Sequence, residues 1–396
     1  MLVIGAQEAV NLLRFFDDLP DPRSSVNRLH RLGDVIVMAI CAVLANADGP
    51  TAIAQWAKLN AAWLRRHLAL PGGIPGKDTF RRVLGLLPPA TFQQCFQQWL
   101  QTLQTTADEE SENPRHIAID GKTLRRSHDR RHGLGPMHIV SAWASDCGIT
   151  LGQVATEEKS NEITAIPQLL EQIDVQDAIV TIDAAGCQKT IAAKIVEGKG
   201  DYVLALKGNQ EKLLHDVKFL MLGPLQDDCS GGRVSRYVEV EQGHGRLEAR
   251  TYYQMTAPSY LHGRSQWKGL KTIGAAVRVY EENGIEKRDV RYYISSLRRN
   301  GPQFARAVRR HWGIENSLHW SLDMTYREDE SRVRHLTSAE NLSWLRRMTL
   351  GLIKHHPGKQ SNIMKRRMAG WSPDFLMQVL TGKGSQYLHQ RWRLEM

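Results

Sequence analysis

The chain has 396 residues, a hydrophobic content of 42% and a formal net charge of +10. This composition is that of a folded protein of two or three domains, and it excludes a disordered or low-complexity chain. The excess positive charge points to a polyanionic partner. The apolar run at residues 35–45 is too short to cross a bilayer, so we expect no membrane association and no signal peptide.

Cysteine and histidine usage argues against zinc and disulfide scaffolds. Neither CxxC nor HExxH spacing occurs, and the five cysteines are scattered at positions 41, 95, 147, 187 and 229. We therefore expect a reducing, cytoplasmic location. The phosphate-binding patterns GxxxxGK[ST] and GxGxxG are also missing from the sequence, so use of ATP or NAD is not indicated.

Apolar residues recur at helical spacing through residues 1–105, which predicts a helical N-terminal domain. Residues 106–115 are polar, acidic and contain a proline, and we interpret them as a linker. Residues 116–210 change to a pattern of three strands, a helix, a strand, a helix and a strand. The predicted strands are 116–120, 137–144, 150–155, 178–183 and 202–206, and the helices are 162–173 and 188–197. This order predicts an α/β fold, a mixed sheet with helices on its faces.

The remaining residues divide into three predicted parts. Residues 211–300 alternate in the manner of strands, without a strong helical pattern, and are interpreted as a β-rich insertion. Residues 301–355 begin with a long helical pattern that reaches about Tyr326 and should complete the core. Residues 356–396 form a predicted basic C-terminal arm. From Arg346 to the end the chain has ten Lys and Arg but two acids, which suits a DNA-contacting arm or, alternatively, a solubilising tail.

Two stretches have the same form, an apolar strand that runs into an aspartate. They are His116-Ile-Ala-Ile-Asp120 and Ile179-Val-Thr-Ile-Asp183. Carboxylates at the ends of neighbouring buried strands would be held rigidly at one sheet edge, where they form a hard-oxygen site for divalent metal.

A third carboxylate, Glu315, falls on a helical stripe whose other members are apolar: Val308, Trp312, Leu318 and Leu322. A carboxylate on a core-facing stripe needs a partner. That partner is either a cation such as Arg310 or His311, or a metal shared with Asp120 and Asp183. Other candidates for the third carboxylate are Asp323, Glu328, Asp329 and Glu330, although four adjacent acids are more typical of a solvated loop.

Three such carboxylates could hold two Mg²⁺ ions about 4 Å apart, with Mn²⁺ able to substitute, for attack on a phosphodiester. Polar residues beside the aspartates could contact DNA phosphates, or could belong to ordinary turns. They are Lys122, Arg125, Arg126, Arg130, Arg131, Lys207, Asn209 and Gln210, to which we add Arg310 and His311 on the Glu315 helix.

The chain resembles bacterial insertion-sequence transposases of the DDE type, and especially the H-repeat-associated proteins found beside Rhs elements. The resemblance covers nearly the whole chain. It is carried by Leu19-Pro-Asp-Pro-Arg23, Gly73-Ile-Pro-Gly-Lys-Asp-Thr-Phe80, Ala118-Ile-Asp-Gly-Lys-Thr-Leu124, Glu158-Lys-Ser-Asn-Glu-Ile-Thr-Ala-Ile-Pro167, Asp183-Ala-Ala-Gly-Cys-Gln-Lys189, Asp201-Tyr-Val-Leu-Ala-Leu-Lys-Gly-Asn-Gln210, Arg291-Tyr-Tyr-Ile-Ser-Ser296 and His311-Trp-Gly-Ile-Glu-Asn316.

This resemblance implies a ribonuclease-H-like core interrupted by the β insertion, and Asp120, Asp183 and Glu315 as the Mg²⁺ ligands. It implies cleavage and joining of double-stranded DNA, at the element's terminal repeats and at target DNA, by a homodimer or larger assembly near the bacterial nucleoid. Wider relatives carry Arg four residues before the Glu and Lys seven after it. This chain has His311 and Leu322 there, and His319 is a candidate substitute.

Three functional hypotheses follow from these residues and the resemblance. The first is an active transposase, with the N-terminal helices recognising the DNA ends and the C-terminal arm adding affinity. The second is a sequence-specific DNA-binding protein derived from a transposase and retired from catalysis. The third is a plain nuclease with the same core.

Overall fold

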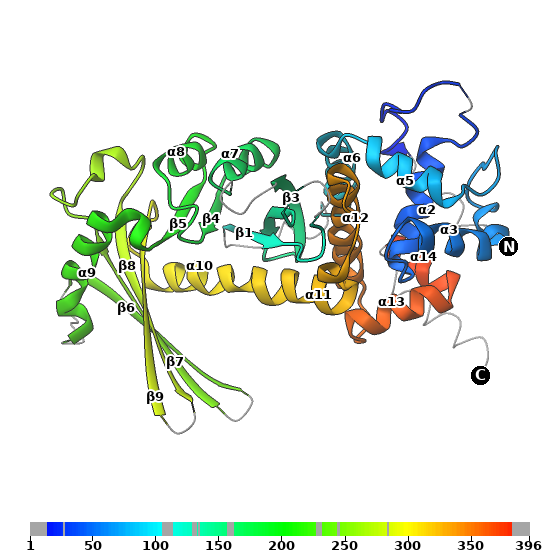
Figure 1. The fold of residues 1–396 in the computed structure, drawn as a ribbon. Coiled ribbons are helices and arrows are strands. Elements are labelled where there is room, and N and C mark those ends of the chain that lie inside the picture. The colour runs from blue at the N-terminus through cyan, green and yellow to red at the C-terminus, as the bar shows by residue number, and fades with distance from the viewer. Residues whose placement is uncertain are drawn as a thin grey trace.

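The computed structural model describes residues 14–26, 28–104, 114–128, 133, 135–156, 162–226, 232–243, 246–282 and 285–381. Within them a central sheet carries helices on both faces, and a helical body lies beside one end of the sheet (Figure 1). Nearly all of the predicted linker, 106–115, falls outside the described residues, as do Arg130 and Arg131. None of the described helices is long and apolar enough to cross a membrane.

The sheet has nine strands in the order β3-β2-β1-β4-β5-β9-β8-β7-β6. Its first five strands are those predicted for residues 116–210. β1, β4 and β5 are parallel, and β2 and β3 are antiparallel to their neighbours. The bounds are β1 Arg115–Thr123, β2 His138–Ala144, β3 Ile149–Thr156, β4 Ala178–Ile182 and β5 Asp201–Leu206. The predicted ribonuclease-H-like mixed sheet is confirmed.

The predicted β-rich insertion continues this same sheet, because its last strand pairs antiparallel with β5. The four long antiparallel strands extend away from the rest of the molecule (Figure 1). They are β6 Val234–Gly243, β7 Arg246–Thr256, β8 Thr272–Glu282 and β9 Ile285–Ser295. The expectation of no strong helix in this region was wrong, since α9 (Glu211–Gln226) precedes them. Leu213, Val217 and Met221 recur at helical spacing and give α9 its buried face.

Helices cover both faces of the sheet (Figure 1). On one face, α7 (Glu162–Gln172) and α8 (Lys189–Glu197) bury an apolar stripe with β1, β4 and β5. On the other, α10 (Gly301–Gly313) packs Phe304 and Val308 against the sheet residues Ile179 and Val203. A π-helical turn, η5 (Ile314–His319), and α11 (Trp320–Tyr326) continue α10.

The helical body is built from both ends of the described chain, which share one apolar core. α12 lies against α2, α5 and α6, and α13 lies against α2. The helices are α2 Leu32–Leu44, α3 Pro50–Leu59, α4 Ala61–Leu64, α5 Lys77–Leu86, α6 Pro89–Gln104, α12 Leu336–His355, α13 Asn362–Trp371 and α14 Pro373–Thr381. The N-terminal helices therefore do not bury their apolar faces alone.

The predicted basic C-terminal arm is corrected for residues 356–381, which form the packed helices α13 and α14. Four of the basic side chains counted from Arg346 onward are buried: Arg346, Arg347, Lys365 and Arg366. Arg366 donates to the Val43 carbonyl at 2.7 Å, so its charge serves the helical body and not a DNA surface. Residues 382–396 lie outside the described part of the chain.

Candidate active site

Asp120 and Asp183 lie beside each other because their strands are parallel and in register. Ile119 is the register partner of Ile182, and the two aspartates are the next residues in each segment. The prediction that this strand ends at Asp120 was wrong. β1 continues to Thr123 and stays paired with β2. The Asp120 side chain is 25% exposed, so the carboxylate lies in a recess at this edge of the sheet.

The loop after β4 is held in place by hydrogen bonds. The Asp183 carboxylate accepts from the backbone N–H of Ala185 at 3.0 Å. The Asn209 side chain donates to the Ala184 carbonyl at 2.7 Å, and the Gln210 side chain donates to the Cys187 carbonyl at 3.0 Å. Asn209 and Gln210 thus support the loop that carries Asp183. Their predicted contacts with DNA stay predictions.

Glu315 reaches the aspartates by a different geometry from the one expected. The stripe prediction was right for Val308, Leu318 and Leu322, which are buried, and wrong for Trp312 and Glu315. The π turn η5 begins after Trp312 and adds a residue to the helical turn that carries Glu315. Leu318 and Leu322 are buried, whereas Trp312 is 39% exposed and the Glu315 side chain is 64% exposed. Glu315 therefore faces the site and not the apolar core.

The structure brings Asp120, Glu315 and His319 together, with one ligand atom of each within 4.8 Å of the others. His319 Nδ1 lies 3.1 Å from Glu315 Oε2 and 3.6 Å from Asp120 Oδ2. The imidazole is 5% exposed, so it lies beneath the two carboxylates. The sequence predicts His319 only as a substitute cation, whereas the structure places it four residues after Glu315 and in reach of Asp120 as well.

Electrostatics at this cluster favour a bound cation. Burial raises the pKa of Asp120 to about 6, although His319 and the Gly121 N–H oppose the rise; the charges of Asp183 and Glu315 raise it further. The hydrogen bond from His319 lowers the pKa of Glu315. Asp120 and Glu315, whose oxygen atoms approach each other at a recessed edge, fit a divalent metal ion. Asp183 is not part of this group, although it lies on the neighbouring segment.

The predicted contact of Lys122 with DNA phosphate is corrected by its surroundings in the structure. Its side chain is 7% exposed, and Nζ pairs with Asp323 at 2.7 Å and with Asp329 at 2.8 Å. The ammonium is thus enclosed by carboxylates and is not presented to phosphate. Arg125 and Arg126, in contrast, are exposed beyond the end of β1. Lys207 is also exposed, at the end of β5.

The competing acids after Glu315 are all engaged in ion pairs. Asp323 and Asp329 pair with Lys122, and Glu330 pairs with Arg327. Glu328 is fully buried and accepts from Arg347 at 2.8 Å. These pairings leave Glu315 as the acid of this segment that points to the aspartates.

The Glu328–Arg347 pair also supports the strand that carries Asp120. Arg347 is fully buried, and its Nε donates to Ser141 Oγ at 3.1 Å. Ser141 is the register partner of Asp120 on β2. The pair therefore ties α12 and the segment after α11 to the centre of the site.

His311 contacts the strand that leads into Asp183. Its Nδ1 lies 3.1 Å from Thr181 Oγ1, which in turn lies 3.2 Å from His116 Nε2. Burial lowers the pKa of His311 to about 4, against the opposing effect of Asp183. His311 is therefore neutral near pH 7 and lacks the charge of an arginine at this position. Arg310 pairs with Asp146; its predicted DNA contact stays a prediction.

Gly121 allows this packing directly after Asp120. A Cβ at position 121 would overlap His138 Nε2 and would lie 2.5 Å from Glu162 Oε1. His138 and Glu162 themselves approach to 2.5 Å, which joins β2 to the start of α7. The Asp-Gly-Lys run thus combines a ligand candidate with a position where a side chain would displace His138 and Glu162.

Comparison with known proteins adds a family to this geometry. A family model described as "Transposase DDE domain" matches residues 111–352, and one described as "DDE_Tnp_1-associated" matches residues 13–100. The chain is 38% identical over 361 residues to "Putative transposase YncI" of Escherichia coli O157:H7, which covers 90% of each chain. It is 35% identical to "H repeat-associated putative transposase YhhI" of Escherichia coli K12, over 95% of this chain and 99% of that protein.

Among solved structures, the chain aligns with a piggyBac transposase in a synaptic complex with hairpin DNA. The alignment covers 99% of this chain and 79% of that one, with 11% identity and a TM-score of 0.38.

Proposed function

Because the chain belongs to the family of the transposase DDE domain, we propose that it cuts DNA at the ends of an insertion sequence and joins the freed ends to target DNA. The observation that carries this proposal is the meeting of Asp120 and Glu315, from β1 and η5, beside Asp183. The partners would be double-stranded DNA with the element's terminal repeats and the target DNA.

In this proposal Asp120, Asp183 and Glu315 hold two Mg²⁺ ions, for which Mn²⁺ can substitute. Bound divalent ions lower the pKa of an attacking water and stabilise the leaving oxygen of a phosphodiester. The protein's part is to fix the ligands. The register of β1 and β4 sets the spacing of the aspartates, and His319 orients the Glu315 carboxylate.

DNA would approach the carboxylates over a positively charged rim. Arg125 and Arg126 lie just beyond Asp120 in the chain. Lys207 directly follows β5, which lies two strands away from β1 in the sheet. Exposed cations at such positions suit backbone phosphates, which give affinity without sequence selection. Since joining requires two DNA ends to be held together, we further propose a homodimer or larger assembly on DNA.

The test is a cleavage and strand-transfer assay on DNA that carries the element's terminal repeats, with Mg²⁺ or with EDTA. Glu315→Gln and Asp183→Ala should lower cleavage by more than about 100-fold, because losing a group that merely supports a metal ligand already costs roughly 10–100-fold. DNA binding should survive in both variants. Glu330→Gln, a matched change at an exposed acid paired with Arg327, should keep full activity.

Each alternative gives a different product pattern in the same assay. Nicks without joined products or preference for the repeat ends would indicate a plain nuclease. Tight binding to the repeats without cleavage in Mg²⁺ or Mn²⁺ would indicate a retired DNA-binding protein. Full activity of Glu315→Gln would overturn the assignment of the third carboxylate.

A further inference from the structure

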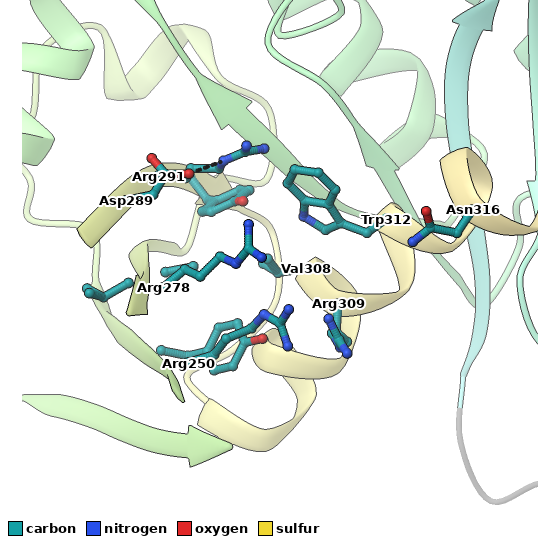
Figure 2. Close-up of a pocket in the computed structure, with 12 residues that line it drawn as sticks. Arg250, Arg278, Asp289, Arg291, Val308, Arg309, Trp312 and Asn316 are labelled. Carbon is teal, nitrogen blue, oxygen red and sulfur yellow. Dashed lines mark hydrogen bonds and ion pairs between the residues drawn. The ribbon is translucent and has the colours of Figure 1, made fainter. Parts of the chain in front are cut away.

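A polar cavity lies between α10 and the long strands β7–β9, and none of the predicted site residues line it. Its volume is about 280 Å³, and its charged residues are Arg250, Arg278, Arg291, Arg309 and Asp289. Figure 2 shows the arginines converging on this cavity from the strands and from α10. Four guanidinium groups and one carboxylate therefore line the same small space.

Acidic neighbours hold these arginines in place. Glu248 pairs with Arg278 and Arg250, and Glu241 pairs with Arg250 and Arg309. Asp289 pairs with Arg291 at 3.2 Å. A fourth carboxylate, Glu239, is the register partner of Arg250 on β6 and accepts a hydrogen bond from the Tyr252 hydroxyl at 3.3 Å, so the four arginines face four carboxylates in all. Of these four acids, Asp289 alone lines the cavity. Glu241 and Glu248 are not among the residues that line the cavity, so they orient the guanidinium groups from outside it.

The strand register places two arginines side by side at this cavity. Arg250 on β7 is the direct register partner of Arg278 on β8, and their outer partners are the acids Glu239 on β6 and Asp289 on β9. These acids offset the repulsion between the two arginines and hold them at the cavity. An anion in the cavity would meet guanidinium groups that line it directly, and planar guanidinium groups match phosphate oxygens well.

The cavity adjoins the carboxylate site through α10 and η5. Trp312 and Asn316 line its wall, and Asn316 directly follows Glu315 (Figure 2). The Arg291 guanidinium lies over the Trp312 ring, 4.1 Å from its centroid. His311 directly precedes Trp312, and its Nδ1 lies 3.1 Å from Oγ1 of Thr181, two residues before Asp183. A ligand in the cavity would thus sit near the reacting phosphodiester.

The size of the cavity limits what can enter. Its volume is at the lower end of the roughly 300–1,000 Å³ typical of ligand pockets. One phosphate with its attached sugar is of this scale, whereas a double helix can only lie across the opening.

We propose that this arginine cavity binds one backbone phosphate of a DNA strand beside the cleavage site. The proposal rests on the proposed function in one respect, that DNA is the substrate. It assigns a role to Arg291, the first residue of the run Arg291-Tyr-Tyr-Ile-Ser-Ser296.

The test measures DNA binding in EDTA, so that cleavage plays no part. Labelled terminal-repeat DNA and an unrelated duplex are titrated at several salt concentrations with the wild type and with an Arg278→Gln/Arg291→Gln variant. The slope of log affinity against log salt should be smaller by about 0.9 in the variant, because one phosphate contact is lost. The affinity itself should also fall.

The matched control is Arg115→Gln/Arg299→Gln, which removes the same charge outside the cavity. Arg115 is 49% exposed and pairs with Asp174 at 3.2 Å. It resembles Arg291, which is 46% exposed and pairs with Asp289 at 3.2 Å. Arg299 is exposed and donates to a carbonyl, that of Gly232. This control should keep the wild-type slope.

An unchanged slope in the cavity variant, or an equal fall in the control, would overturn the proposal. If thermal unfolding shows that the double variant is misfolded, Arg291→Gln alone decides with the same expected change. The two proposals can fail separately. If the cavity variant has a smaller slope but the wild type never cleaves DNA, the cavity binds phosphate and the transposase activity is rejected. If the wild type cleaves DNA but the cavity variant keeps the wild-type slope, the activity is supported and the cavity proposal is rejected.

Discussion

His319 is the residue whose position changes the description of the site most. Its ring lies within 3.6 Å of a carboxylate oxygen of Asp120 and of Glu315, and it is nearly buried. A group that fixes the orientation of a metal-binding carboxylate commonly strengthens metal binding without touching the metal. We therefore treat His319 as a positioning residue.

His319→Ala should weaken Mn²⁺ binding by roughly 10–100-fold, because Glu315 loses the partner that orients it. Isothermal titration calorimetry without DNA measures this directly. His355→Ala is the matched control, since His355 is an exposed histidine of α12 whose Nδ1 lies against the Gly351 carbonyl. Equal Mn²⁺ affinity in wild type and His319→Ala would remove His319 from the site.

Glu340 gives the protein a pH-dependent stability that is separate from catalysis. Burial raises the pKa of this carboxyl from 4.5 to about 7, against a hydrogen bond from the Ala155 N–H. Between those two values the folded state binds more protons than the unfolded state, so the free energy of unfolding falls as pH rises.

Glu340→Gln keeps the shape of the side chain and removes the titration. The variant should be more stable than the wild type by roughly 1–3 kcal/mol at pH 8, and the difference should shrink towards zero near pH 4.5. Denaturant unfolding at several pH values measures it. A difference that does not vary with pH would show that Glu340 is not the group responsible.

At the scale of elements, the strand-end aspartates could be predicted and the helix that carries Glu315 only in part. Apolar runs that end in Asp120 and Asp183 specify both the strand and the carboxylate, and the parallel register then places them together. Glu315 belongs to a π turn, whose extra residue leaves no periodic signal. The sequence pattern also put Trp312 in the core, although this residue, which precedes the π turn, is 39% exposed.

Burial of charge was the other feature that the sequence did not show. Lys122, Arg347 and Arg366 look like surface cations, yet each is enclosed by partners from distant segments. Composition cannot distinguish a basic DNA-binding surface from a buried ion pair, because the partners are known only once the chain is folded. The arginine cavity was missed for the same reason, as its four members come from different elements.

Arg347 should be essential to the element that supports Asp120. Arg347→Ala should lower the free energy of unfolding by about 3–5 kcal/mol, because it leaves the fully buried Glu328 without its closest cation. Adding Glu328→Gln to Arg347→Ala should recover part of the loss, since the buried charge is then gone. Denaturant unfolding tests both, and a double variant no more stable than Arg347→Ala would contradict this account.

At the scale of the whole molecule, the helical body needs its C-terminal helices. A chain that ends after Lys354 should lose cooperative unfolding, because α13 and α14 cover the core shared with α2. Calorimetry of this truncation beside the full chain tests this. If the shorter chain folds normally, α13 and α14 are dispensable, and truncation there becomes a fair test of DNA affinity.

The joining of the two chain ends in one helical body also governs how the protein can be made. Asn341 donates to the carbonyls of Leu84 and Leu87, and Arg366 reaches Val43 across 323 residues of sequence. Contacts of such separation close slowly, and they cannot form on the ribosome until the last helices emerge. An interrupted copy of the gene would therefore yield an N-terminal segment with an uncovered apolar face, which is prone to degradation or aggregation, and not a truncated DNA-binding protein.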